Sequence, residues 1–210
     1  MKVSKAQATE NRGAIVHAAA RQIRERGFDQ VSVADVARAA GLTHGALYSH
    51  FTSKETLQAE ATREAFKETL AAFTGLSSEE FLRRYLSPQH RDSAAVGCPN
   101  AALVSEIWRQ PEETQQAFLE GLLGFINLTS DTLGSDAHEH SRDRAVTVFA
   151  TLVGGLALSR AIRDVDRAVS DDILRAIASQ IKSLIGSGRV DGKAATGNRP
   201  AKGALTKGKL

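Results

Sequence analysis

The sequence predicts an all-helical protein. Apolar residues recur at spacings of three and four along most of the chain, as they do on one face of a helix. Runs of Val, Ile and Thr bounded by turns, which are typical of strands, are missing from the sequence. Pro88, Pro99 and Pro111 all lie between residues 87 and 112, so this stretch should hold short helices and connections, with longer helices on both sides.

The first helix is expected to begin near Thr9, whose hydroxyl can cap it, and to end at Gly27. Its inner face consists of Ile15, Val16, Ala19, Ala20 and Ile23. Ser32 and Asp35 then have the spacing of a capping box, which predicts a second, short helix over 33–40.

Two further helices complete the N-terminal region. Thr43 can cap a third helix over 44–50, and Ser53 can cap a fourth, longer one. The inner face of the fourth helix carries Leu57, Ala61, Ala65, Phe66, Leu70 and Phe73. Beyond Gly75, helices are expected at 78–86, 100–109, 112–133, 141–164 and 170–185.

The charge balance differs between regions of the chain. The 210 residues carry a formal net charge of +3, and 42% are hydrophobic, which is typical of a soluble globular protein of one or two domains. Residues 1–54 have a balance of +4, residues 55–185 of −6 and residues 186–210 of +5. The positive charge of residues 1–54 would attract this region to the negatively charged DNA backbone. The Gly-, Ala- and Lys-rich tail over 186–210 should be disordered, and it either adds salt-sensitive attraction to DNA or is only a solvated end.

Cysteine usage and hydropathy bear on the compartment. The lone Cys98 cannot form an intrachain disulfide, which favours a cytoplasmic protein. The first ten residues lack the apolar stretch of a signal peptide. The longest nearly apolar run, Phe149–Leu158, is far shorter than the roughly 18 residues that a membrane-spanning helix needs, so no membrane segment is expected.

The two short helices have the form of a helix-turn-helix, which we place at about 32–51. They are joined by Gly41, Leu42 and Thr43, a tight turn that contains glycine. Val36, Leu47 and Phe51 can fill the interior between this pair and the first helix. The exposed side of the second helix would carry groups able to meet phosphates or base edges, namely Thr43, His44, Gly45, Tyr48, Ser49 and His50.

These residues resemble those of a known family. The stretch from Phe28 to Leu57, with the preceding Gly27, reads GFDQVSVADVARAAGLTHGALYSHFTSKETL and is similar to the DNA-binding signature of the TetR/AcrR bacterial transcriptional regulators. The resemblance implies a three-helix DNA-binding domain over about 9–69 and a helical effector-binding and dimerisation domain over 70–185. It also implies a homodimeric repressor that a small-molecule effector releases from a near-palindromic operator, with no catalytic role for the matching residues.

The resemblance places the helix over 44–49 in the major groove of DNA, with the residues from Thr43 to Ala46 nearest the bases. Tyr48, His50 and Lys54 would hold phosphates. The predicted DNA-binding residues are Ser32, Thr43, His44, Gly45, Ala46, Tyr48, Ser49, His50 and Lys54. The alternative is that Tyr48 and His50 only pack the module together.

The last two helices carry apolar stripes wider than one protomer needs. Two helices from each protomer would form a four-helix dimer interface, which is the arrangement that the resemblance implies. The predicted interface residues are Phe149, Val153, Leu156, Ile173, Ile177 and Ile181. Ordinary core packing is the alternative.

The middle helices should enclose an effector pocket. Its candidate residues are Phe81, Tyr85, Cys98, Asn100, Trp108, Phe118, Leu122 and Phe125. Aromatic residues at helical spacing can equally be plain core. Cys98 lies just before an expected helix, whose amides favour a thiolate, so the alternative function is a redox or electrophile sensor of the same fold acting through Cys98. A lone cysteine can also be a small buried hydrophobe.

No metal, cofactor or catalytic activity is expected. The stretch Asp136–His140 contains ligand-type residues, but it should be a surface loop without a Cys or a distant His to complete a tetrahedral set. A serine elbow, a phosphate loop and an H-E-x-x-H motif do not occur in the sequence. An architectural DNA binder that does not repress, or a small helical enzyme, are the competing function classes.

Overall fold

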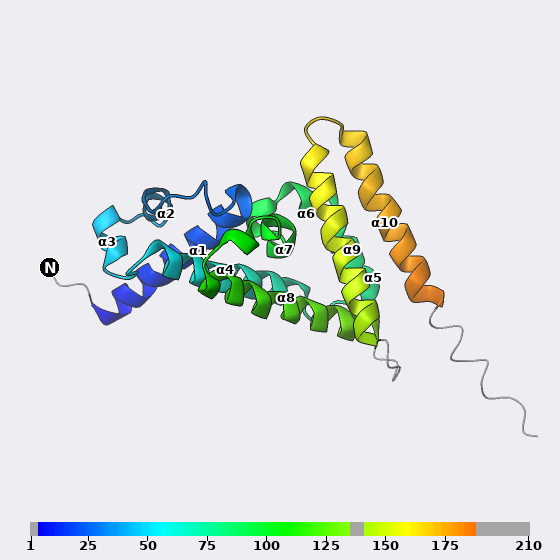
Figure 1. Ribbon diagram of the computed structural model, residues 1–210, viewed down its shortest axis with the longest axis horizontal. Coiled ribbons are helices and arrows are strands. Elements are labelled where there is room, and N and C mark those ends of the chain that lie inside the picture. The colour runs from blue at the N-terminus through cyan, green and yellow to red at the C-terminus, as the bar shows by residue number, and fades with distance from the viewer. Residues whose placement is uncertain (1–3, 135–140, 188–210) are drawn as a thin grey trace, which may run out of the picture.

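The computed structural model describes residues 4–134 and 141–187, and within them every regular element is a helix, as predicted (Figure 1). The α-helices are α1 (Lys5–Arg26), α2 (Val33–Ala39), α3 (His44–Tyr48), α4 (Lys54–Phe73), α5 (Ser78–Tyr85), α6 (Pro88–Asp92), α7 (Pro99–Leu103), α8 (Glu112–Leu133), α9 (Ser141–Ile162) and α10 (Arg167–Ser187). Two 3-10 turns, η1 (Ala94–Val96) and η2 (Ile107–Arg109), lie before and after α7.

The helices form an elongated molecule with different elements at its two ends. Helices α1, α2 and α3 occupy one end in Figure 1, and the pair α9 and α10 stands at the other. Helix α4 packs against both α1 and α8, and α8 packs in turn against α9. Helix α4 therefore joins the N-terminal helices to the rest of the protein.

Local capping signals explain where the N-terminal helices begin. The hydroxyls of Ser32, Thr43 and Ser53 accept hydrogen bonds from the backbone N–H groups of Asp35, Ala46 and Thr56, which confirms three predicted caps. The expected cap at Thr9 is wrong. Ser4 caps α1 through the N–H of Gln7 at 3.1 Å, and Thr9 lies inside the helix. Ser4 also has a side-chain hydroxyl that can cap a helix, and no residue between Ser4 and Thr9 breaks a helix, so α1 begins earlier in the chain.

Other boundaries differ from the prediction as well, most of all those of α7 and α10. The helix expected over 100–109 ends at Leu103 and resumes only as η2. The interruption frees Glu106 to turn toward α1, a long-range contact that local pattern does not reveal. Helix α10 begins at Arg167 and includes Gly186 and Ser187, which were assigned to the tail. The rest of the expected tail, 188–210, and the stretch 136–140 lie outside the described residues.

A buried arginine fixes α1 on α4. The Arg24 side chain is fully buried, and its guanidinium donates to the carbonyl of Ala65, to Thr69 Oγ1 and to Glu68 on α4. Burial lowers the pKa of Arg24, and the bond to Glu68 acts against that effect. A buried charge is tolerated only when it is paired and hydrogen-bonded, so this contact defines how the two helices sit together.

Helix α9 contains a segment, Arg142–Ile162, that could cross a membrane by length and composition alone. The expectation from the sequence counted only the uninterrupted run Phe149–Leu158 and so missed the full segment. In the structure α9 packs against α8 and α10, and it places Phe149, Leu152 and Leu156 in the core. Core helices of soluble proteins satisfy the same test, although 39% of this segment is buried and Val146 and Leu158 remain exposed.

Helix α8 approaches α4 closely at Gly121. A Cβ atom at this position would overlap the ring of Phe66, which also contacts Phe118 and Phe125 edge to face. We expect Gly121→Ala to lower the free energy of unfolding by about 1–3 kcal/mol, because the buried Phe66 ring would have to shift against the rings that it contacts. Urea unfolding measures the change.

Gly13→Ala is the matched control. Gly13 also lies inside a long helix, α1, but a Cβ atom there meets nothing within 4 Å. Its substitution should raise stability by up to about 1 kcal/mol through helix propensity alone. Equal shifts for the two variants would show that the contact with Phe66 does not restrict Gly121.

Candidate nucleic-acid interface and ligand cleft

Helices α2 and α3 form the predicted helix-turn-helix. The turn between them passes through Gly41 at a φ of 70°, a conformation that favours glycine, and the N–H of Leu42 donates to the carbonyl of Ala37 at 2.9 Å. Val36, Leu47 and Phe51 are buried in the same core as α1, as predicted. This packing leaves one side of α3 facing outward.

The outward side of α3 carries most of the predicted DNA-binding residues. Tyr48 is 50% exposed, and its ring meets the ring of His44 edge to face with 5.0 Å between centroids. Ala46 and His50 are half-buried. The exposed members of the set are Ser32, Thr43, His44, Gly45, Tyr48 and Ser49. These six residues therefore offer hydroxyls, an imidazole and open backbone to a partner.

The amino ends of α2 and α4 lie next to each other beside this surface. Ser32 caps α2, Lys54 begins α4, and both residues border one small hollow. Lys54 is half-buried, so its stem packs against protein while its ammonium can reach outward. The structure thus brings together residues that are 22 positions apart in the sequence.

One contact links the end of α1 to the segment after α7. Glu106 Oε2 accepts a hydrogen bond from the backbone N–H of Phe28 at 2.9 Å. Gly27, which ends α1 with a φ of 82°, lies against the same carboxylate, and a Cβ atom there would overlap it. The carboxylate can reach the backbone only because residue 27 has no side chain.

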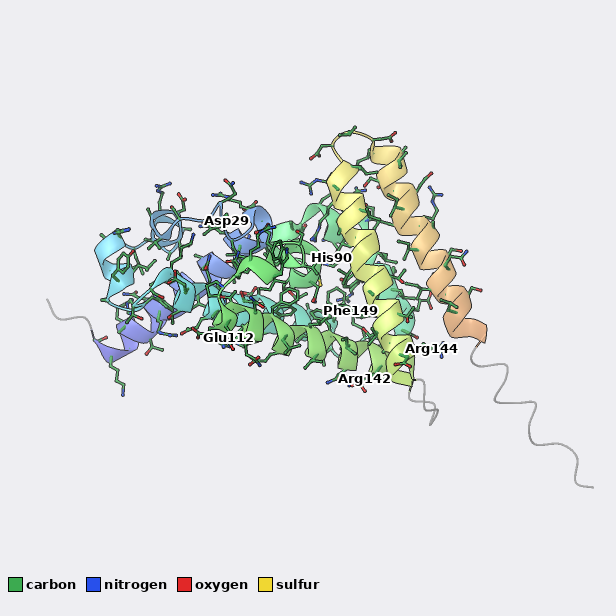
Figure 2. All side chains as sticks on the ribbon, in the orientation of Figure 1. Asp29, His90, Glu112, Arg142, Arg144 and Phe149 are labelled. Carbon is green, nitrogen blue, oxygen red and sulfur yellow. The ribbon has the colours of Figure 1, made fainter. Side chains whose placement is uncertain are left out.

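A cleft of about 400 Å³ opens between α7, α8 and α9. Its lining residues are Asn100, Val104, Phe118, Leu122, Ile126, Val146, Phe149, Ala150, Val153 and Gly154. Phe149 stacks on Phe125 of α8 with 5.2 Å between centroids, and Figure 2 labels Phe149 beside α9. Three predicted pocket residues, Asn100, Phe118 and Leu122, line this cleft.

The other predicted pocket residues lie elsewhere. Phe81 and Tyr85 belong to an aromatic cluster with Phe73, and Phe125 lies beneath Phe149 in the core. Trp108 is 68% exposed on η2 and packs against the guanidinium of Arg109. The sequence pattern did not reveal that α9 forms one wall of the cleft, because its stripe was assigned to the dimer interface.

The predicted dimer residues divide into two groups. Phe149, Leu156 and Ile181 are buried within the protomer, while Val153, Ile173 and Ile177 are partly exposed. More exposed apolar residues lie near the turn between α9 and α10, namely Leu158, Val165 and Val169, with Val165 at 89% exposure. Val146 of α9 and Leu184 of α10 are exposed as well, so exposed apolar residues lie toward both ends of this helix pair.

A group of ligand-type side chains that sequence analysis missed lies between α1 and α4. Ligand atoms of His17, Glu64 and Glu68 lie within 4.8 Å of one another. Arg24 donates to Glu68 and Lys67 to Glu64, so the protein's own cations already pair with both carboxylates. We interpret the group as an ion-pair network between two helices. His17 is 47 or more positions from the two glutamates, so only the folded chain brings it to them.

Cys98 lies in a buried polar cluster beneath α7. Its side chain is inaccessible, and its sulfur accepts a hydrogen bond from Asn100 Nδ2 at 3.6 Å. Burial raises the pKa of Tyr85 well above its ordinary value, and the neighbouring Cys98 acts in the same direction. The charges of Arg24 and Arg160 also interact with Cys98. The thiol is thus hidden from solvent but close to two cations.

His90 is held neutral beside this cysteine. The Cys98 N–H donates to His90 Nε2 at 2.9 Å, so Nδ1 carries the proton and donates to the carbonyl of Tyr85 at 2.7 Å. Burial lowers the pKa of His90 to about 4, and the charge of Arg160 adds to this effect. Figure 2 labels His90 beside α9.

Comparisons with known proteins agree on the N-terminal region. A family model described as bacterial regulatory proteins, tetR family, matches residues 15–61. The regulator TtgR of Pseudomonas putida is 39% identical over 66 residues, which are 31% of each chain. The probable acrEF/envCD operon repressor of Escherichia coli (strain K12) is 28% identical over 135 residues, 58% of each chain. The alignments thus span about a third and somewhat over half of these relatives.

Solved structures extend the likeness in fold to the C-terminal helices. The reduced form of NemR from E. coli superposes with a TM-score of 0.68 at 18% identity, over 82% of this chain and 95% of that one. At this identity the likeness concerns the fold alone.

The neutral state of His90 predicts a pH dependence of stability. Between its usual pKa of about 6.5 in the unfolded chain and about 4 in the folded one, only the unfolded chain takes up the proton. The contribution of His90 is therefore complete above pH 6.5 and is lost as the pH falls toward 4. Wild-type protein should lose about 2 kcal/mol more stability than His90→Gln between pH 7.5 and 5.

Urea unfolding of both proteins at several pH values tests this expectation. The two proteins differ only at position 90, so the difference between the curves isolates that residue. Parallel curves would show that His90 is free to take up a proton in the folded protein.

Proposed function

The chain belongs to the TetR/AcrR family of transcriptional regulators, and we propose that it is a cytoplasmic, homodimeric repressor. A small-molecule effector would release it from a near-palindromic operator. The observation that carries this proposal is the exposed polar side of α3 on a capped helix-turn-helix. TtgR and the acrEF/envCD repressor are named as regulators of transcription, which supports the same role here. Binding to DNA also explains the positive charge balance of residues 1–54.

We assign the base contacts to the start of α3. Thr43, His44 and Gly45 are exposed there, and Gly45 has open space around it, so the backbone can approach the edges of base pairs. Tyr48 follows one turn later on the same helix, where its hydroxyl can donate to a phosphate. His50 and Lys54 add contacts to the backbone of the DNA, and Lys54 does so from the first turn of α4.

Dimerisation would supply the second half-site contact. A single module buries too little surface for tight and specific binding, whereas two modules read half-sites one helical turn or a multiple of it apart. Leu158, Val165 and Val169 give α9 and α10 an exposed apolar face near their turn. Packing this face against its copy would form a four-helix interface, and Val153, Ile173 and Ile177 would border it.

The contact between Glu106 and the end of α1 would couple effector to DNA. Glu106 follows α7, which forms one wall of the cleft through Asn100, and it bonds the N–H of Phe28 directly after α1. A ligand that moves α7 would thus shift α1, and the helix-turn-helix packed on it, relative to the partner module. Reciprocity requires DNA to weaken effector binding by the same factor.

Tyr48→Ala tests the assignment of α3. It should weaken binding to operator DNA, selected from a random library by the purified protein, about tenfold or more, because a hydrogen bond to a charged phosphate is lost. Tyr48→Phe keeps the ring contact with His44 and should lose a similar factor if the hydroxyl carries the effect. Fluorescence anisotropy measures affinity, and sedimentation should show an unchanged oligomer.

Trp108→Ala is the control, since it removes an exposed aromatic side chain outside the helix-turn-helix. Its operator affinity should match that of the wild type. Undiminished binding by Tyr48→Ala would remove α3 from the interface, and a footprint without two half-sites would favour an architectural DNA binder.

A second candidate function is redox or electrophile sensing through Cys98. The observation that favours it is the electrostatic interaction of Cys98 with Arg24 and Arg160. Against it stands the burial of the thiol, which requires an opening of α7 before a reagent can enter.

Modification with N-ethylmaleimide separates this function from effector binding. If Cys98 is a sensor, modified wild-type protein should lose at least about tenfold in operator affinity, while Cys98→Ser treated in the same way keeps its affinity. Mass spectrometry gives the extent of modification. Unchanged affinity of fully modified protein would rule the sensor out.

A further inference from the structure

The cleft between α7, α8 and α9 has a lining that restricts what can bind there. Nine of its ten lining residues are apolar or glycine, and the tenth is Asn100. None of the ten is titratable, so a charged group would lose its hydration without gaining a partner. Its volume of about 400 Å³ lies within the range of small-molecule sites.

Asn100 is the feature of the cleft that points to a ligand. Its side chain is 2% exposed, and its Nδ2 group donates to the sulfur of Cys98. Its Oδ1 atom is buried and has no hydrogen-bond partner in the protein. Buried carbonyl oxygens are nearly always bonded, and Asn100 lines the cleft, so this unpaired acceptor can bond a donor in the cleft once its amide turns toward it.

We propose that the cleft binds a neutral, mainly apolar small molecule with one hydrogen-bond donor, which Asn100 Oδ1 accepts. This inference rests on the proposed effector role of the cleft and names the chemical class of the effector. A small molecule fits better than a protein segment, because the cleft has a volume of only about 400 Å³. Aliphatic contacts come from α8 and α9, and the rings of Phe118 and Phe149 can cover an aromatic ligand.

Three naphthalene derivatives of similar size test this class by titration calorimetry on the full-length protein without DNA. 2-Naphthol has a hydroxyl donor, 2-methoxynaphthalene has only an acceptor, and 2-naphthoate is an anion. We expect 2-naphthol to bind about tenfold more tightly than the methoxy compound, because only the hydroxyl can pair with Oδ1. 2-Naphthoate should not bind measurably. Equal or tighter binding of the methoxy compound or of the anion would overturn the inference.

Two variants locate the site. Asn100→Leu keeps the size of the side chain and should bring 2-naphthol and 2-methoxynaphthalene to equal affinity. Gly154→Leu should weaken binding of both at least about tenfold, because a Cβ atom at Gly154 meets nothing within 4 Å and the new side chain would occupy part of the cleft. Ala71→Leu, on the exposed side of α4, is the control and should bind like the wild type. Thermal unfolding confirms that each variant is folded.

The outcomes separate this inference from the proposed repressor function. If Gly154→Leu binds 2-naphthol as the wild type does, the cleft is not the binding site, although operator binding stays intact. If 2-naphthol binds as expected without weakening the operator complex, the assignment of ligand class is upheld and the effector role fails. If 2-naphthol also weakens operator binding, and Asn100→Leu reduces that effect, both are supported.

Discussion

The burial of one guanidinium underlies the arrangement of this protein. Arg24 carries its charge into the interface of α1 and α4, where Ala65, Thr69 and Glu68 satisfy its donors. A pair of helices held only by apolar contacts could slide or rotate at small cost in free energy. A buried guanidinium finds its hydrogen-bond partners in only one arrangement of the helices, and in any other it would be left unpaired at a high cost. Thr69 also donates to the carbonyl of Gly97, so the same network reaches the segment that leads to Cys98.

The remaining parts are arranged around α4. Its first turn borders the helix-turn-helix, its middle faces α1 and α8, and its end meets the aromatic cluster of Phe73, Phe81 and Tyr85. The C-terminal helices are tied together separately. Arg91 of α6 is fully buried and bonds Ser170 and Asp171 of α10, and Arg160 of α9 donates to the carbonyls of His90 and Arg91. Buried arginines therefore set the helix positions in both halves, and apolar packing fills the space between them.

Sequence reasoning succeeded where structure is decided locally. The caps at Ser32, Thr43 and Ser53 depend on groups three residues apart, so the pattern alone predicted them correctly. It failed where distant residues decide. Helix α7 ends at Leu103, and Glu106 beyond it pairs with a backbone group 78 positions away, which no local pattern indicates. The apolar stripe of α9 serves the core and a cleft wall as well as an open face, and periodicity cannot assign each residue among these uses. An unpaired atom such as Asn100 Oδ1 is visible only once every neighbour is in place.

The absence of a side chain at Gly27 separates the strength of the response to a ligand from the specificity of binding. The position lies in neither the proposed DNA-binding surface nor the cleft, yet it admits the carboxylate that joins them. Variation at or around this joint could change how strongly a regulator responds to its ligand while leaving the recognised DNA and the recognised ligand the same. Response strength and binding specificity would then evolve, or be engineered, as independent traits of one chain.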